Sequence, residues 1–153
     1  MNISTNFTLT EATYSETAIR LGINNQPSEA QLENMKIAAS GMERIRSLLG
    51  KPIRINSWLR LPEVNIAVGG SAKSSHMDGW AIDFTCSSFG DPYKIAKAIK
   101  ESDIQLDQCI HEYGRWVHVS FAPEMRGQFL TIFRPQNKYL SDILSEEEYS
   151  SSF

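Results

Sequence analysis

The feature that most constrains this chain is an aspartate in the middle of a strand-like segment. Residues 80–85 read Trp-Ala-Ile-Asp-Phe-Thr, an alternation that predicts a strand with Ala81, Asp83 and Thr85 on one face. A buried carboxylate is costly unless a cation, hydrogen-bond donors or a metal ion compensates its charge. Because Ala81 and Thr85 are small and leave room beside Asp83, the fold must bring such a partner to this face.

The chain contains three histidines, His76, His111 and His118. His76 lies in a predicted loop seven residues before Asp83, and His118 lies within Trp-Val-His-Val-Ser, whose alternation predicts a second strand. Two neutral imidazoles and one carboxylate are ligands that zinc accepts while its fourth position stays open for water. The commonest zinc-peptidase motif, HExxH, is absent. Residue types and spacing alone therefore leave open that these histidines are ordinary core or surface residues.

A longer pattern around these residues resembles the zinc D-alanyl-D-alanine carboxypeptidase family. The resemblance is carried by Ser-x-His-x-x-Gly-x-Ala-x-Asp at residues 74–83 and by Trp-Val-His-Val-Ser at residues 116–120. Residues 7–11, 56–60 and 65–70 are also similar to the small phage and bacterial branch of that family. The family includes VanX-like dipeptidases and phage endolysin peptidases, and it shares its fold with the hedgehog signalling domain. The resemblance covers most of the chain.

The resemblance implies a role for each matching residue. His76, Asp83 and His118 match the ligands of a catalytic Zn²⁺ ion. Arg60 matches an arginine that contacts substrate or the developing oxyanion, although a surface arginine is the alternative. Ser74 matches the serine of the motif, which implies contact with substrate or support of a ligand, with capping of the loop as the alternative.

The general base of the family is a glutamate shortly before the last histidine ligand. In VanX-like members it stands three residues before, and that position here is Arg115, whose guanidinium cannot accept a proton. Glu112 stands six residues before His118, a spacing similar to that of the hedgehog-type and small phage branch. Glu112 is therefore the candidate base, and His111 is the alternative base or oxyanion stabiliser.

The turn of a predicted hairpin decides between these two candidates. A two-residue turn at 114–115 would place His111 opposite His118 and Glu112 on the other face of the sheet. A three-residue turn at 113–115 would place Glu112 on the face of His118. The sequence leaves both turns open, and a catalytic role for Glu112 requires the three-residue turn.

The other segments predict an α+β fold with an antiparallel sheet core flanked by helices. The clearest helix is capped by Ser28 and ended by Gly50, with apolar residues three or four apart on one face. Helices and strands do not alternate regularly, which argues against a parallel sheet. We expect one zinc peptidase-like domain of the hedgehog/DD-peptidase type over residues 1–140, including an N-terminal helical arm, and a flexible acidic tail at 141–153.

Composition narrows the class of protein further. The 153 residues, 41% hydrophobic and 22% charged, are typical of one globular domain, which we expect to be a monomer. The net charge of -3 offers no basic surface for nucleic acid, and no run of 18 apolar residues predicts a membrane span. Cys86 and Cys109 lack metal or redox spacing and are expected to be reduced and buried, with a disulfide between them as the alternative in an oxidising compartment.

Together these patterns predict a zinc metallopeptidase that hydrolyses peptidoglycan stem peptides or cross-bridges, as a D-Ala-D-Ala carboxypeptidase or as an endolysin-like endopeptidase. Which bond it cuts stays open. The alternative is a zinc-binding recognition module of the same fold without activity. The N-terminus lacks the basic and apolar regions of a secretory signal. We therefore expect synthesis in the cytoplasm and action on the cell wall after release, or as part of a virion.

Overall fold

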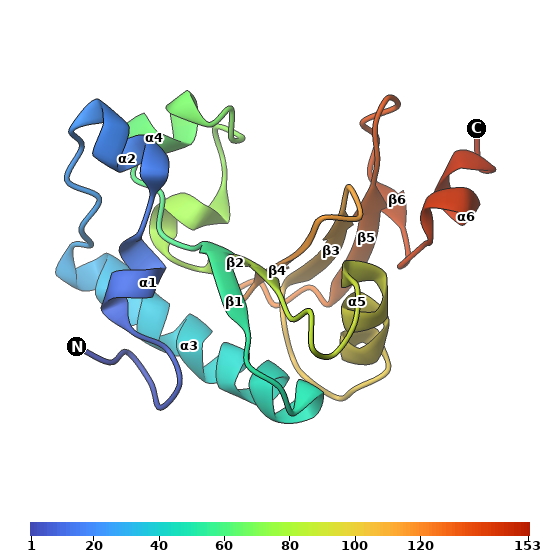
Figure 1. The fold of residues 1–153 in the computed structure, drawn as a ribbon, viewed down its shortest axis with the longest axis horizontal. Helices are drawn as coiled ribbons and strands as arrows, with labels where there is room; N and C mark the ends of the chain where they lie inside the picture. Colours follow the sequence, from blue (N-terminus) through green and yellow to red (C-terminus); the bar gives the residue numbers. More distant parts are fainter.

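A six-stranded sheet forms the centre of the computed structural model, which describes residues 1–153 (Figure 1). The strand order is β1-β2-β4-β3-β5-β6, and every neighbouring pair is antiparallel except β3 and β5. The strands are β1 (Arg54–Ser57), β2 (Ala81–Thr85), β3 (Gln108–Glu112), β4 (Trp116–Ser120), β5 (Gln128–Ile132) and β6 (Leu140–Ser141).

The predicted α+β class, with a sheet flanked by helices, is confirmed. The sheet is mixed rather than wholly antiparallel, because both edges of β4 are already paired, one with β2 and one with β3. The chain leaving β4 must therefore cross to the free edge of β3. Because β3 and β4 are antiparallel, a strand that runs opposite to β4 is parallel to β3. The next strand, β5, runs in this direction and pairs with β3 in parallel.

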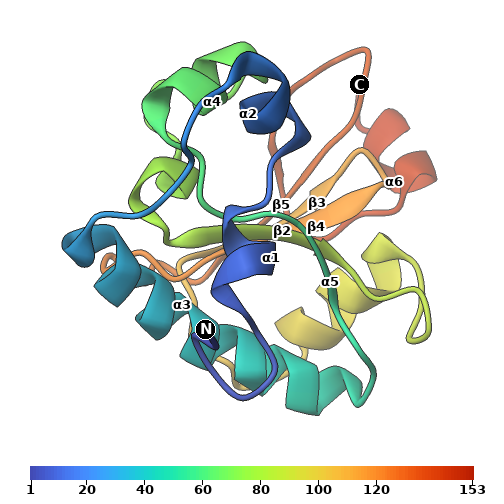
Figure 2. The ribbon, with the colours of Figure 1, turned by 60° about the vertical axis from the view of Figure 1, so that its left-hand side comes forward.

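Helices lie on both sides of this sheet, with α3 and α5 on one side and α2 and α4 on the other (Figure 2). Side-chain caps start most of them; at α3, Ser28 and Gln31 form a capping box, and Gly50 ends the helix in the left-handed conformation. The helices are α1 (Leu9–Thr13), α2 (Glu16–Leu21), α3 (Glu29–Leu49), α4 (Pro62–Ala67), α5 (Pro92–Lys100), α6 (Glu146–Ser150) and a 3₁₀ turn η1 (Ser75–Asp78). None of them has the length and hydropathy to cross a bilayer.

The core lies between α3, α5 and one face of the sheet. Met35, Met42 and Ile45 of α3 are fully buried together with the apolar residues of β2 and β4, which are Ile82, Phe84, Val117 and Val119. Cys86 and Cys109 are buried and unpaired, as predicted. Because the apolar residues occupy this face, the alternate positions of the same strands point to the other face, where Asp83 and His118 lie.

The C-terminal residues 141–153, for which a flexible tail was predicted, pack against the sheet instead. Ile143 and Tyr149 are 1% and 0% exposed. The Tyr149 hydroxyl donates to the carbonyl of Lys138 at 2.6 Å, and Thr131 Oγ1 donates to the carbonyl of Asp142 at 2.9 Å. The serines and glutamates that favour fraying surround two apolar anchors, and the burial of these anchors holds the segment in place.

One glycine of the core generates a stability prediction. A Cβ at Gly41 would lie 2.2 Å from the ring of Phe121, which is itself buried. Glycine to alanine normally stabilises a helix interior, but here the clash should dominate, so Gly41→Ala should destabilise the fold by about 1–3 kcal/mol. Urea unfolding measures this. Ser40→Ala, on the exposed face of the same helix, should change the free energy of unfolding by less than about 0.5 kcal/mol.

Candidate metal centre and catalytic site

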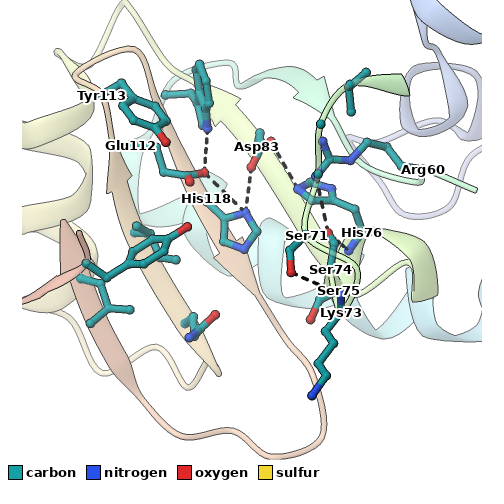
Figure 3. Close-up of a pocket in the computed structure, with 18 of the residues that line it drawn as sticks. Arg60, Ser71, Lys73, Ser74, Ser75, His76, Asp83, Glu112, Tyr113 and His118 are labelled. Atoms are coloured by element: carbon teal, nitrogen blue, oxygen red, sulfur yellow. Dashed lines mark hydrogen bonds and ion pairs between the residues drawn. The ribbon is translucent and has the colours of Figure 1, made fainter. Parts of the chain in front are cut away.

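Three separate elements bring His76, Asp83 and His118 together. Asp83 of β2 lies directly opposite His118 of β4 in the antiparallel ladder, and His76 reaches them from η1 (Figure 3). One ligand atom from each residue lies within 4.8 Å of the other two. The three residues whose spacing suggested a metal site thus form one cluster that can hold a metal ion.

The loop that carries His76 is fixed at both ends. Ser74 caps η1, with its hydroxyl accepting a hydrogen bond from the backbone N–H of His76 at 3.2 Å. Gly79 ends η1 with a φ of 85°, and an added Cβ would lie 2.6 Å from Met35 of α3. The carbonyl of Gly79 also accepts a hydrogen bond from the indole of Trp58 at 2.9 Å. A short loop packed in this way holds the imidazole of His76 in one orientation.

Two hydrogen-bond acceptors face each other at the centre of the cluster. The carbonyl oxygen of Trp58 lies 2.7 Å from His76 Nδ1, and because a carbonyl only accepts, Nδ1 carries the imidazole proton. His76 Nε2 is then an acceptor; it is buried without a hydrogen-bond partner and lies 3.2 Å from Asp83 Oδ2. A nitrogen lone pair and a carboxylate oxygen at this separation require a cation to join them. Zinc suits the set of two imidazoles and one carboxylate.

The ionisation of the three side chains agrees with this interpretation. Burial by itself raises the pKa of Asp83, yet that pKa is held below its usual range, and the hydrogen bond and charge of His118 contribute to this. Burial lowers the pKa of His76, despite the charge of Asp83, so its imidazole is neutral at pH 7. Burial also lowers the pKa of His118, yet the hydrogen bond and charge of Asp83 outweigh it and raise the pKa overall. A metal ion therefore competes with a proton only at His118.

The hairpin between β3 and β4 has the three-residue turn that a catalytic Glu112 requires. Glu112 pairs with Trp116 and Ile110 pairs with His118, so Glu112 and His118 share one face. The turn residues Tyr113 and Gly114 both adopt the left-handed conformation, with φ of 58° and 66°. Glu112 Oε1 lies 3.8 Å from His118 Nδ1.

Glu112 is held in a setting that favours proton transfer. The indole N–H of Trp116 donates to Glu112 Oε1 at 2.8 Å, which fixes one carboxylate oxygen and leaves the other free. Burial raises the pKa of Glu112 and outweighs the opposing charge of His118. A carboxylate whose pKa is raised toward neutrality is a better proton acceptor than an ordinary glutamate.

The same register turns His111, the alternative base, away from the face of His118. His111 pairs with Val117, so its side chain points to the opposite face of the sheet from His118. There His111 Nδ1 lies 2.9 Å from the carbonyl oxygen of Leu144, and the ring packs at right angles to Phe133. His111 is a buried residue that joins β3 to the C-terminal segment, and it does not reach the metal cluster.

Arg60 and Ser74 both line the cleft that contains the metal cluster. The backbone N–H of Arg60 donates to the carbonyl of His76 at 3.0 Å, which ties the residues after β1 to η1. The Arg60 side chain is half-buried, with its Nε shielded from solvent, and its charge faces Asp83 and Glu112. For Ser74 the structure shows the capping role, and contact of either residue with a substrate stays a prediction.

The cleft has a volume of about 560 Å³, within the range of small-molecule sites. Sequence reasoning missed several residues that line it: Lys73, Tyr113, Trp116, Arg126, Leu130, Arg134 and Tyr139. The three-residue turn contained a signal for Trp116, because it places that residue directly opposite Glu112. The residues after position 120 follow no motif and reach the cleft through the path of the chain alone.

Comparison with known proteins identifies one family. A sequence model of the family described as Peptidase M15 matches residues 5–120, which is most of the chain. The matched range contains the metal cluster, Arg60 and Glu112. No curated protein matches the chain.

The metal site generates a prediction for Asp83→Asn, which keeps the size of the side chain and removes its charge. Zinc affinity should fall by more than about 100-fold, because the acceptor that faces His76 Nε2 loses its negative charge. Titration with zinc, followed by calorimetry and by elemental analysis, measures this. Asp78→Asn, at the exposed end of η1, should bind zinc like the unchanged protein. Equal zinc affinity of the two variants would remove Asp83 from the ligand set.

Proposed function

The chain belongs to the peptidase M15 family of metallopeptidases, and from this we propose that it is a zinc-dependent peptidase that hydrolyses the peptides of bacterial cell walls. The observation that carries the proposal is the position of Glu112, which lies on the face of the metal cluster with one carboxylate oxygen held by Trp116. A metal cluster with a carboxylate base beside it is the arrangement that hydrolysis of an amide requires.

The residues of the cleft support a simple reaction. His76, Asp83 and His118 would hold a Zn²⁺ ion, which would supply Lewis-acid polarisation of the scissile carbonyl. Glu112 takes a proton from the attacking water, and the water oxygen bonds to the carbonyl carbon. Glu112 then returns the proton to the leaving nitrogen as the C–N bond breaks. Arg60 places a positive charge beside the developing oxyanion or a substrate carboxylate.

The walls of the cleft favour a polar, anionic peptide as substrate. Cationic side chains line it on several sides, and most of its other lining residues are polar. Stem peptides and cross-bridges of peptidoglycan carry free carboxylates and match this character. We propose hydrolysis of such a peptide, by a D-Ala-D-Ala carboxypeptidase or by an endopeptidase. An endolysin-like enzyme of this kind would meet the wall after release from the cell or as part of a virion.

A recognition module that binds zinc without cutting is the alternative function. It was favoured by Arg115, which occupies the position of the base in VanX-like members. Arg115 is exposed in the hairpin turn and does not line the cleft, whereas Glu112 does. The geometry therefore favours a peptidase over the recognition module.

The proposed function is tested by digestion of purified cell walls with four samples. The unchanged protein should release peptides, and a chelator should abolish this release. Glu112→Gln should bind zinc normally and lose about 10²- to 10⁴-fold in kcat, because the amide cannot accept the proton. Mass spectrometry of the released peptides identifies the bond that is cut. Glu124→Gln, a matched change on the exposed surface, should leave kcat unchanged.

The contradicting outcomes are distinct. A protein that binds zinc tightly and releases no peptide from any wall would be a recognition module. A Glu112→Gln variant with full turnover would remove Glu112 as the base.

Trp116→Phe should move the acid limb of the pH–rate profile to higher pH. Burial raises the pKa of Glu112, and the indole hydrogen bond of Trp116 opposes this by favouring the charged carboxylate. Loss of the indole donor should raise the pKa further, so the base is protonated, and activity is lost, at a higher pH. The dependence of kcat/KM on pH measures the shift. Trp80→Phe, the same change outside the cleft, should leave the profile in place, and an identical acid limb in both variants would contradict a role for the indole.

A further inference from the structure

One wall of the cleft is formed by residues that lie beyond the range matched by the M15 family. The match ends at residue 120, yet Arg126, Leu130, Arg134 and Tyr139 line the cleft together with the metal cluster. These residues come from β5 and from the loops before and after it. The matched range supplies the metal ligands and the base, and the later part of the chain supplies much of the surface that a substrate meets.

The cationic side chains of the cleft differ in whether their charge is already compensated. Arg126 Nε and Nη2 donate to the two carboxylate oxygens of Asp107 at 2.8 and 2.9 Å, and Arg60 faces the carboxylates of Asp83 and Glu112. Arg134 forms no ion pair and donates no side-chain hydrogen bond. Lys73 is also without an ion pair, but no aromatic ring holds it in place.

Arg134 is held beside the residue that follows the base. Glu112 pairs with Ile132 in the parallel ladder, and the N–H of Tyr113 donates to the carbonyl of Ile132 at 2.9 Å. The guanidinium carbon of Arg134 then lies 4.4 Å from the centre of the Tyr113 ring. This cation–π contact orients the guanidinium and leaves its N–H donors free.

We propose that Arg134 binds a free carboxylate of the peptide substrate and makes the enzyme prefer stem peptides in which that carboxylate is not amidated. The guanidinium presents paired N–H donors that match a carboxylate, and its position beside Tyr113 places them on the Glu112 side of the metal cluster. The inference rests on the proposed peptidase function and names the chemical group that the cleft selects. The carboxylate is either the α-carboxylate of the γ-linked D-Glu or the C-terminal one.

The probe is a cross-linked dimer of the stem peptide L-Ala-γ-D-Glu-L-Lys-D-Ala-D-Ala, which contains each class of bond considered. Two further versions carry an amide, either at the D-Glu α-carboxylates or at the C-terminus. The unchanged enzyme should lose about 10- to 100-fold in kcat/KM on one of the two amidated versions, because a charge-assisted hydrogen bond is lost. The version that is affected identifies the carboxylate.

Arg134→Gln should abolish this preference. On the unamidated peptide, the kcat/KM of this variant should fall by the factor that amidation costs the unchanged enzyme. On the amidated peptide that the unchanged enzyme cuts slowly, its kcat/KM should change by less than about 2-fold. Its zinc content and unfolding temperature should equal those of the unchanged enzyme. Arg115→Gln, a matched change in the hairpin turn outside the cleft, should keep the preference. A purely structural role for Arg134 would lower kcat/KM on all three peptides alike and would overturn the inference.

The remaining outcomes separate the inference from the proposed function. If the unchanged enzyme cuts all three peptides equally well, it is a peptidase and Arg134 does not select a carboxylate. If Arg134→Gln keeps the full preference, another residue reads the carboxylate and the inference is wrong. If the unchanged protein binds zinc and cuts neither these peptides nor cell walls, the proposed function itself fails.

Discussion

The structure depends on the encounter of two buried acceptors, His76 Nε2 and the carboxylate of Asp83. Neither acceptor can donate a hydrogen bond to the other, so a cation between them is needed to compensate both. The carbonyl of Trp58 creates this need for a cation. It accepts a hydrogen bond from His76 Nδ1, which carries the only proton of the neutral imidazole, so Nε2 has no proton to donate to Asp83. A metal ion bound here joins η1 to β2 and β4, and metal binding is therefore coupled to the stability of the fold.

The geometry of the base follows from the sheet rather than from the metal. The three-residue turn sets the pairing of β3 with β4, and a change of one residue in this register would exchange Glu112 for His111 on the face of the site. The parallel pairing with β5 then fixes β3 from its other edge. The C-terminal segment adds a further restraint, since it binds the imidazole of His111 on the opposite face. Glu112 is thus positioned by contacts on both faces of its strand.

The cluster of His76, Asp83 and His118 could be predicted from the sequence because each of these residues leaves a local signal. Asp83 and His118 interrupt apolar alternations, and His76 belongs to a motif of fixed spacing. The register of the hairpin could not be predicted, since it depends on the left-handed conformation of Tyr113, which is uncommon for a tyrosine. The packing of the C-terminal segment escaped prediction for another reason. Its buried apolar residues, Ile143 and Tyr149, stand among serines, glutamates and the less buried Leu144, and their burial depends on tertiary contacts.

The proposed catalytic residues and the proposed carboxylate-binding residue lie on different parts of the fold. The residues of the metal cluster and Glu112, the proposed base, lie on β2, β3, β4 and η1, which are held by the core helix α3 and by each other. Another part of the cleft wall lies on β5 and its flanking loops, and β5 pairs with the edge of β3. Substitutions in these loops can therefore change the charge and shape that a substrate meets without moving a metal ligand. The proposed role of Arg134 depends on this arrangement, because the edge of β3 holds its ring partner, Tyr113, next to Glu112.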